Sequence, residues 1–122
     1  MAKILIVDDD VETTALFENL IRSNGHEPVA VNSSLTAIEA IKAESPDLIF
    51  LDIMMPQVNG IELCKMIKAT QAIKDIPVVM VSALSDKGTK RDSANAGAED
   101  FLTKPVLPHD FAKKLRSLFE GQ

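Results

Sequence analysis

Residues whose side chains could do chemistry occur at four separate places, each directly after an apolar run. They are the acidic triplet Asp8-Asp9-Asp10, Asp52, Ser82 and Lys104. Carboxylate oxygens are the ligands that hard divalent cations prefer, and a hydroxyl or an ammonium group can bind phosphoryl oxygens. If folding brings these groups together, the chain has the parts of a site for phosphoryl chemistry.

Crowded carboxylates need a counter-charge, because two of them about 4 Å apart repel by about 4 kcal/mol at an effective dielectric near 20. Mg²⁺, completed by water and one backbone carbonyl, would relieve this repulsion. A carboxylate can also attack phosphorus and form an acyl phosphate. Asp52 is the best candidate, since it ends an uninterrupted apolar run. A simpler interpretation, that an aspartate after a strand caps a helix, applies best to Asp10.

Short apolar runs alternate with longer amphipathic stretches, which is typical of βα units. Strands are predicted at Lys3–Val7, Glu27–Val31, Leu48–Asp52, Pro77–Ser82 and Glu99–Thr103. Most of them are continuously apolar, as expected for parallel strands covered on both faces. Ligands of open α/β sheets bind beyond the carboxyl ends of the strands, where the four reactive groups lie.

Five helices are predicted between and after these strands. They cover Val11–Asn24, a stretch from near Ser34, a stretch after Gly60, Lys87–Ala96 and a stretch from about Pro108. The first carries two pairs at i, i+4, Leu16/Leu20 and Phe17/Ile21, which indicate a core-facing stripe. The fourth has little more than Ala94 and Ala96 to bury. We therefore expect it to be weakly anchored and hypothesise that it moves.

The composition limits the possible functions. The length of 122 residues fits one domain, and no apolar run approaches the roughly 20 residues that cross a membrane. The N-terminus lacks the features of a signal peptide, so we expect a cytoplasmic protein without a membrane partner. A net charge of −5 argues against direct binding of nucleic acid. The single cysteine, Cys64, is expected to be a buried apolar residue.

Four motifs resemble the receiver domain of two-component response regulators, with a chemotaxis-regulator-like pattern over essentially the whole chain, residues 1–122. They are Ile4–Asp10, Pro46–Pro56 with Gly60, Pro77–Ala83 and Gly97–Pro105. The resemblance implies a flavodoxin-like, doubly wound α/β fold. Its five parallel strands would have the order 2-1-3-4-5 and would be accompanied by five helices.

The resemblance also implies a role for each matched residue. The phosphoacceptor would be Asp52, and Mg²⁺ or Mn²⁺ would be held by Asp8, Asp9, Asp52 and the backbone carbonyl of Met54. The residues that bind the phosphoryl group or switch would be Ser82, Lys104 and Phe101. A cis peptide bond would precede Pro105. Asp8 would act mostly through metal-bound water. In relatives, the positions of Met54 and Leu84 control attack by water on the phosphoryl group. Both side chains are apolar here, which predicts slow self-hydrolysis.

As a function, the resemblance implies a switch in a phosphorelay. Asp52 would receive a phosphoryl group from the phosphohistidine of a sensor histidine kinase or phosphotransfer protein. The face formed by the fourth helix, fifth strand and fifth helix would then signal to a downstream protein or output domain, or form a phosphorylation-dependent homodimer. Such a protein is no enzyme toward other substrates, because it catalyses only its own phosphorylation and dephosphorylation.

Three other functions would use some of the same features. A phosphatase of the haloacid-dehalogenase type would need a second acid two residues after the nucleophile, where this chain has Met54. A nucleotide- or flavin-binding domain would need a Gly-rich phosphate loop, and neither Gly-x-Gly-x-x-Gly nor a Walker-type segment occurs. A receiver-like module that is never phosphorylated typically loses the acids or the lysine, and all of them are present.

Overall fold

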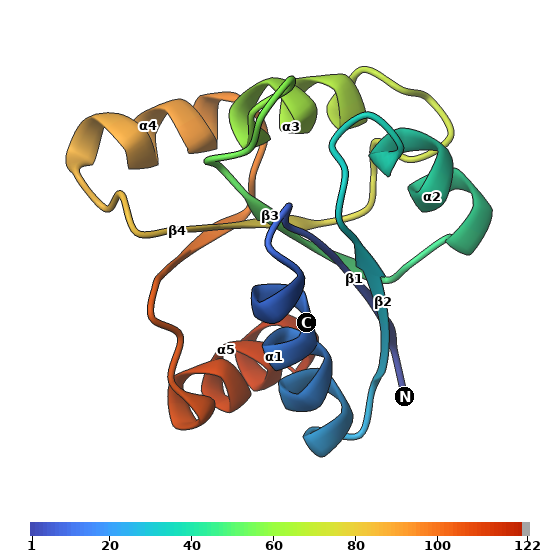
Figure 1. Cartoon of the computed structure of the whole chain (residues 1–122), viewed down its shortest axis with the longest axis vertical. Coiled ribbons are helices and arrows are strands. Elements are labelled where there is room, and N and C mark those ends of the chain that lie inside the picture. Colours follow the sequence, from blue (N-terminus) through green and yellow to red (C-terminus); the bar gives the residue numbers. More distant parts are fainter. Residues whose placement is uncertain (121–122) are drawn as a thin grey trace.

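A five-stranded parallel sheet lies between two layers of helices in the computed structural model, which describes residues 1–120 (Figure 1). Its strands are β1 (Lys3–Val7), β2 (Glu27–Val31), β3 (Leu48–Asp52), β4 (Val78–Ser82) and β5 (Asp100–Thr103). Their order is β2-β1-β3-β4-β5, and every pair is parallel. The predicted fold and strand order are confirmed; β4 and β5 each begin one residue later than predicted.

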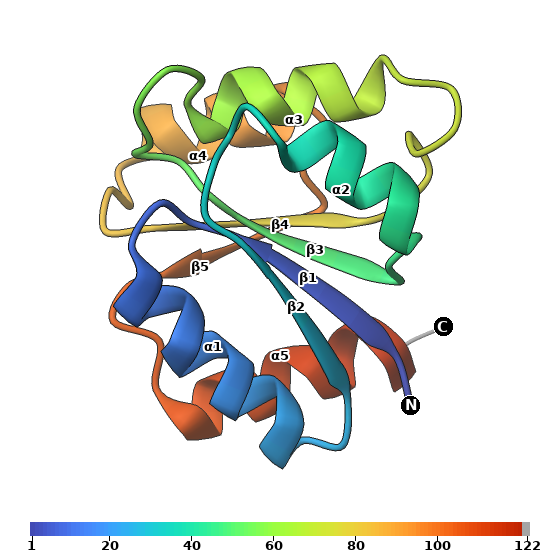
Figure 2. The same ribbon diagram turned by 45° about the vertical axis from the view of Figure 1, so that its right-hand side comes forward.

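The helices are α1 (Val11–Ser23), α2 (Ala37–Glu44), α3 (Gly60–Lys68), α4 (Lys87–Asn95) and α5 (Pro108–Glu120). One face of the sheet is covered by α1 and α5, and the other by α2, α3 and α4 (Figure 2). The prediction that the second helix starts near Ser34 was wrong, because residues 34–36 form a turn. Among the described residues, no helix is long and apolar enough to cross a membrane.

Each face of the sheet has its own apolar core, as the two-residue period of the strands requires. In β1, Leu5 and Val7 pack toward α2 and α3, whereas Ile4 and Ile6 pack toward α1 and α5. Every residue of β3 is buried. Leu16, predicted to face the core, is 55% exposed, because the buried stripe of α1 runs through Thr14, Phe17, Leu20 and Ile21. Cys64 is a buried free cysteine, as predicted.

The start of α3 lies directly against the end of β3. The Gly60 N–H donates to the Ile53 carbonyl at 2.9 Å, and a Cβ on Gly60 would overlap the carbonyl oxygen of Asp52. Asn59 caps the helix by accepting from the Glu62 N–H at 2.9 Å. A glycine is therefore needed where α3 approaches the backbone of Asp52.

Helix α4 buries few of its side chains, as predicted. Ser93 is the one buried residue of the helix. Its carbonyl accepts from the Ala98 N–H at 3.1 Å, and the Lys90 ammonium lies 5.7 Å from the centre of the Phe101 ring on β5. So little buried apolar area places α4 at the low end of local stability.

Amide hydrogen exchange measures this directly. The amides of α4 should exchange faster than those of β3, and Lys90→Gln should accelerate α4 exchange about two- to fivefold, because an exposed cation–π contact contributes about 0.5–1 kcal/mol. The matched control is Lys87→Gln, which removes a lysine from the same helix without touching Phe101. Exchange in α4 as slow as in β3 would contradict the weak anchoring.

Candidate functional site

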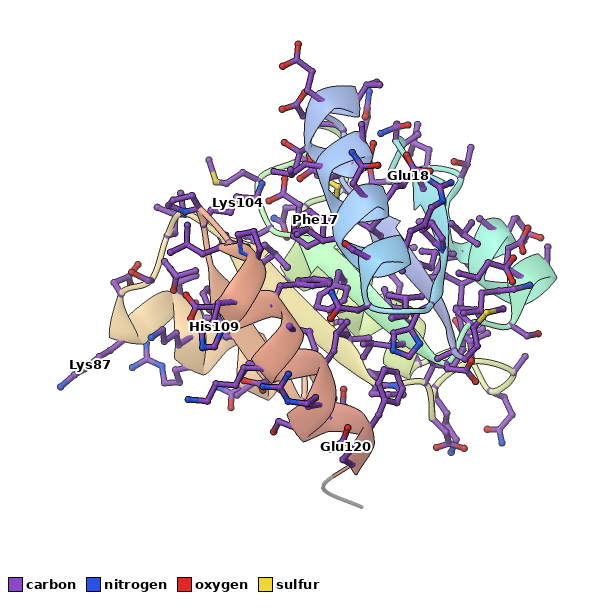
Figure 3. The ribbon with its side chains drawn as sticks, turned by 90° about the horizontal axis from the view of Figure 1, so that it is seen from below. Phe17, Glu18, Lys87, Lys104, His109 and Glu120 are labelled. Atoms are coloured by element: carbon purple, nitrogen blue, oxygen red, sulfur yellow. The ribbon has the colours of Figure 1, made fainter. Side chains whose placement is uncertain are left out.

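The carboxyl edge of the sheet gathers the acidic residues and the lysine predicted from the sequence. Ligand oxygens of Asp8, Asp9 and Asp52 lie within 4.8 Å of one another. The Lys104 ammonium donates to Asp8 Oδ2 at 3.0 Å and to Asp52 Oδ1 at 3.2 Å. Figure 3 shows Lys104 near Phe17 of α1, in the segment that joins β5 to α5. Residues up to 96 positions apart thus form one polar cluster.

Burial and mutual repulsion control the charge of this cluster. Asp8 is 2% exposed and Asp52 is 4% exposed. Burial, and next the charge of Asp8, raise the pKa of Asp52 to about 6, although Lys104 opposes this rise. Burial disfavours the charge of Lys104, but its contacts with Asp8 and Asp52 outweigh this effect and raise the pKa of Lys104. One lysine therefore faces three carboxyl groups, and their hard oxygens fit a divalent cation.

Asp8 is fixed through both its side chain and its backbone. Its Oδ1 accepts from the Asp10 N–H at 2.9 Å, and its own N–H donates to the Val31 carbonyl at 3.0 Å. The Asn32 amide donates to the Asp8 carbonyl at 2.9 Å and to Thr14 Oγ1 at 3.0 Å. The carboxylate is thereby held in place before any ligand binds.

Asp10 has a different role from its two neighbours. Its carboxylate caps α1 by accepting from the Thr13 hydroxyl at 2.7 Å and from the Glu12 N–H at 3.1 Å. These two bonds lower the pKa of Asp10. The helix-cap interpretation of this residue is confirmed.

The loop between β3 and α3, residues 53–59, carries Met54. The Met54 side chain is 64% exposed, whereas its neighbours Ile53 and Met55 are buried. Further along, the Val58 N–H donates to the Pro56 carbonyl at 2.8 Å across Gln57, whose φ is +64°. A hydrogen bond from residue i+2 to residue i across a positive φ is a strained γ-turn.

The remaining predicted residues lie on β4, on β5 and in the segments that follow these two strands. Ser82 is fully buried; its hydroxyl accepts from the Leu84 N–H at 3.1 Å, and its carbonyl accepts from the Lys104 N–H at 2.9 Å. Phe101 is partly buried on the side of the sheet that α4 covers, with the Lys90 ammonium over its ring. Leu84 is 44% exposed, and the Lys104–Pro105 peptide bond is cis.

Two residues that contact the site were missed from the sequence. Asn32 follows β2 and could have been noticed as a polar residue at the carboxyl end of a strand. Ser34 lies in the next turn and is 5% exposed, with its hydroxyl bound to the loop after β3. Its spacing in the sequence carries no signal for such a contact.

This fold and site define a class of small doubly wound α/β domains whose acidic carboxyl edge can hold a divalent cation beside a lysine. The chain matches the response regulator receiver domain family over residues 4–116 and belongs to that family. It is therefore a receiver domain of two-component signal transduction.

Individual relatives agree with this assignment. The polar-differentiation response regulator DivK of Brucella ovis is 32% identical over 114 residues, which is 93% of each chain. The structure of the chemotaxis protein CheY4 of Vibrio cholerae superposes with a TM-score of 0.91 at 25% identity, covering 98% of this chain and 99% of that one. NtrX of Brucella abortus gives 0.88 at 30% identity, and the match covers 98% of this chain but 28% of NtrX.

The raised pKa of Asp52 predicts a pH-dependent effect of Asp52→Asn on stability. The folded protein holds the Asp52 proton more tightly than the unfolded chain does. The free energy of unfolding of the wild type therefore falls as pH rises from about 4 to about 6, and it remains at this reduced value above pH 6. Asparagine removes this loss. In metal-free buffer near pH 7.5, the free energy of unfolding should increase by about 3 kcal/mol, and the gain should vanish toward pH 4.

Urea unfolding of both proteins over this pH range measures the difference. Asp86→Asn is a control of opposite sign, because hydrogen bonds from Thr89 lower the pKa of Asp86. That variant should gain no stability as pH rises. An Asp52→Asn gain that is independent of pH would contradict the electrostatic explanation.

Proposed function

We propose that this receiver domain, residues 1–122, is a phosphorylation switch with Asp52 as the phosphoacceptor. The Asp52 carboxylate attacks the phosphorus of a phosphohistidine on a sensor histidine kinase or phosphotransfer protein. A P–O bond forms, the P–N bond breaks, and the leaving imidazole takes up a proton. The observation that carries the proposal is the burial of Asp52 at the end of β3, with Asp8 and Asp9 within ligand distance and Lys104 on its Oδ1.

A divalent cation, Mg²⁺ with Mn²⁺ as the alternative, would be held by Asp8, Asp9, Asp52 and the Met54 carbonyl. It supplies positive charge that offsets the negative charge of the phosphoryl group. Lys104 already contacts the acceptor carboxylate and could donate a charge-assisted hydrogen bond to an oxygen of the phosphoryl group once it is attached. The Ser82 hydroxyl accepts from Leu84 and retains its own proton to donate.

Exposed apolar side chains around the acidic cluster favour a protein as the phosphoryl donor. Among residues 1–120, eight large apolar side chains are exposed. Six of them belong to α1 or to the loops at the carboxyl edge: Val11, Leu16, Leu35, Met54, Leu84 and Leu107. A cavity of about 340 Å³ opens beside Lys104, between α1 and the segment after β5. A protein surface would bury this apolar rim, whereas a small phosphate donor would leave most of it exposed.

The output would come from α4, β5 and α5. On β5, Phe101 contacts α4 through Lys90, and Asp100 binds Lys114 of α5 at 2.7 Å. A change of charge at Asp52 alters the surroundings of Lys104 and Ser82, which lie at the ends of β5 and β4. We expect this change to reposition weakly anchored α4 and so affect a downstream protein, an output domain or a second copy of the chain. The domain would work in the cytoplasm, without direct contact to nucleic acid, and would catalyse only its own phosphorylation and dephosphorylation.

Intact-protein mass spectrometry after incubation with Mg²⁺ and acetyl phosphate tests the proposal. The wild type should gain the mass of one phosphoryl group, and the adduct should require Mg²⁺ and be labile at alkaline pH. Asp52→Asn should gain none, whereas Asp47→Asn, at the opposite edge of the sheet, should behave as wild type. No adduct from acetyl phosphate or from a phosphohistidine protein would favour a receiver that is not phosphorylated.

The side chain at position 54 should set the lifetime of the phosphoryl group. Apolar Met54 cannot orient water, so Met54→Asn should accelerate hydrolysis of the aspartyl phosphate about two- to tenfold, the effect of one added hydrogen bond. Loss of the adduct over time after removal of the donor gives the rate. The control is Met66→Asn, an exposed methionine on α3. An unchanged rate in Met54→Asn would rule out this role for position 54.

A further inference from the structure

The turn between β2 and α2 contacts both backbone segments that would supply the cation ligands. It contains Asn32 and Ser34, neither of which belongs to the acidic cluster. Asn32 contacts the turn after β1, where Asp8 lies. Ser34 contacts the loop of residues 53–59, where Met54 lies. One short segment therefore bridges two parts of the site that are 46 positions apart in the sequence, from position 8 to position 54.

The Ser34 hydroxyl forms hydrogen bonds with both ends of the strained γ-turn in the 53–59 loop. It donates to the Pro56 carbonyl at 3.1 Å and accepts from the Val58 N–H at 3.3 Å. These two backbone groups flank Gln57, the residue with φ +64°. Positive φ at a non-glycine residue is unfavourable and persists only when its surroundings hold it. Ser34 is 5% exposed, so water cannot readily replace its hydroxyl.

Asn32 holds the other segment in a similar way. Its side-chain amide donates to the Asp8 carbonyl at 2.9 Å and to Thr14 Oγ1 at 3.0 Å. The Thr14 hydroxyl in turn donates to the Val11 carbonyl at 3.0 Å. This chain of bonds joins the Asp8 backbone to the first turn of α1 and to the end of β2.

We propose that Asn32 and Ser34 are positioning residues, which set the distance between Asp8 and the Met54 carbonyl before a cation binds. Neither touches the cation; each acts through the backbone of a ligand-bearing segment. The identity of the cation as Mg²⁺ rests on the proposed function, whereas the bracing of the two segments rests on the hydrogen bonds alone. Residues that orient metal ligands from outside commonly affect metal affinity about 10- to 100-fold when they are replaced.

Titration of the unphosphorylated protein with Mg²⁺ alone, followed by amide chemical shifts, tests this role without a phosphodonor. Ser34→Ala should weaken Mg²⁺ binding about tenfold or more and accelerate exchange of the Val58 amide about tenfold. Asn32→Ala should weaken Mg²⁺ binding but leave Val58 exchange unchanged, because its contacts lie on the Asp8 side. Ser33→Ala is the matched control, since the Ser33 hydroxyl accepts from Leu35 within its own turn, and it should change neither quantity.

A second pair of variants separates loss of the hydroxyl from loss of folding. Ser34→Thr keeps the hydroxyl, whereas Ser34→Val introduces a side chain of the same shape as threonine but without the hydroxyl. Mg²⁺ affinity and Val58 protection that are higher in the threonine variant support the proposal. Equal values in the two variants, or an alanine variant that binds Mg²⁺ like the wild type, overturn it. If the wild type itself does not bind Mg²⁺, the proposed cation is wrong, and Val58 exchange in the apo protein alone decides whether Ser34 braces the loop.

Discussion

Negative charge buried at one edge of the sheet is the constraint on which the rest of the site depends. Asp8 and Asp52 are almost fully buried, and removing carboxylates from water costs several kcal/mol each unless they are paired. Lys104 lies between them and bonds to both. This single lysine offsets part of the charge and leaves Asp52 with a raised pKa. The cluster is therefore prepared for a second positive charge, which a divalent cation can supply.

The strand order makes this arrangement possible. β3 lies between β1 and β4, so the carboxyl end of β3 is next to both the turn after β1, where Asp8 lies, and Ser82 at the end of β4. β5 lies beside β4 and delivers Lys104 from the other side. Because all strands are parallel, their carboxyl ends meet at one edge. Gly60 allows α3 to begin against that edge without displacing the backbone of Asp52.

Rigidity is distributed unevenly around the site. Hydrogen bonds hold the turn after β1 and the 53–59 loop in place. The side chains of Asn32 and Ser34, from the turn after β2, bond to the backbone of these two segments. α4 has one buried residue and few connections. Under the proposed function, the fixed site would respond to phosphorylation through charge, and α4 would report it by changing its arrangement.

Much of this protein was determined by local sequence pattern. Short, mostly apolar runs predicted all five strands to within one residue, because parallel strands covered on both faces need apolar side chains. The places of the acids, the hydroxyl and the lysine directly after predicted strands already indicated that they would meet at one edge of the sheet. The motif resemblance added the strand order. The helix-cap alternative for Asp10 was also visible from its place before a helix.

Only the tertiary structure decided which side chains support the site. The sequence placed Leu16 in the core and the start of α2 near Ser34, and both expectations were wrong. The bonds of Asn32 to Asp8 and of Ser34 to Pro56 join residues 24 and 22 positions apart. Periodicity reports which side of its own element a residue faces, but it does not report which distant backbone group lies opposite. That pairing is fixed only when the sheet closes and the loops at its edge meet.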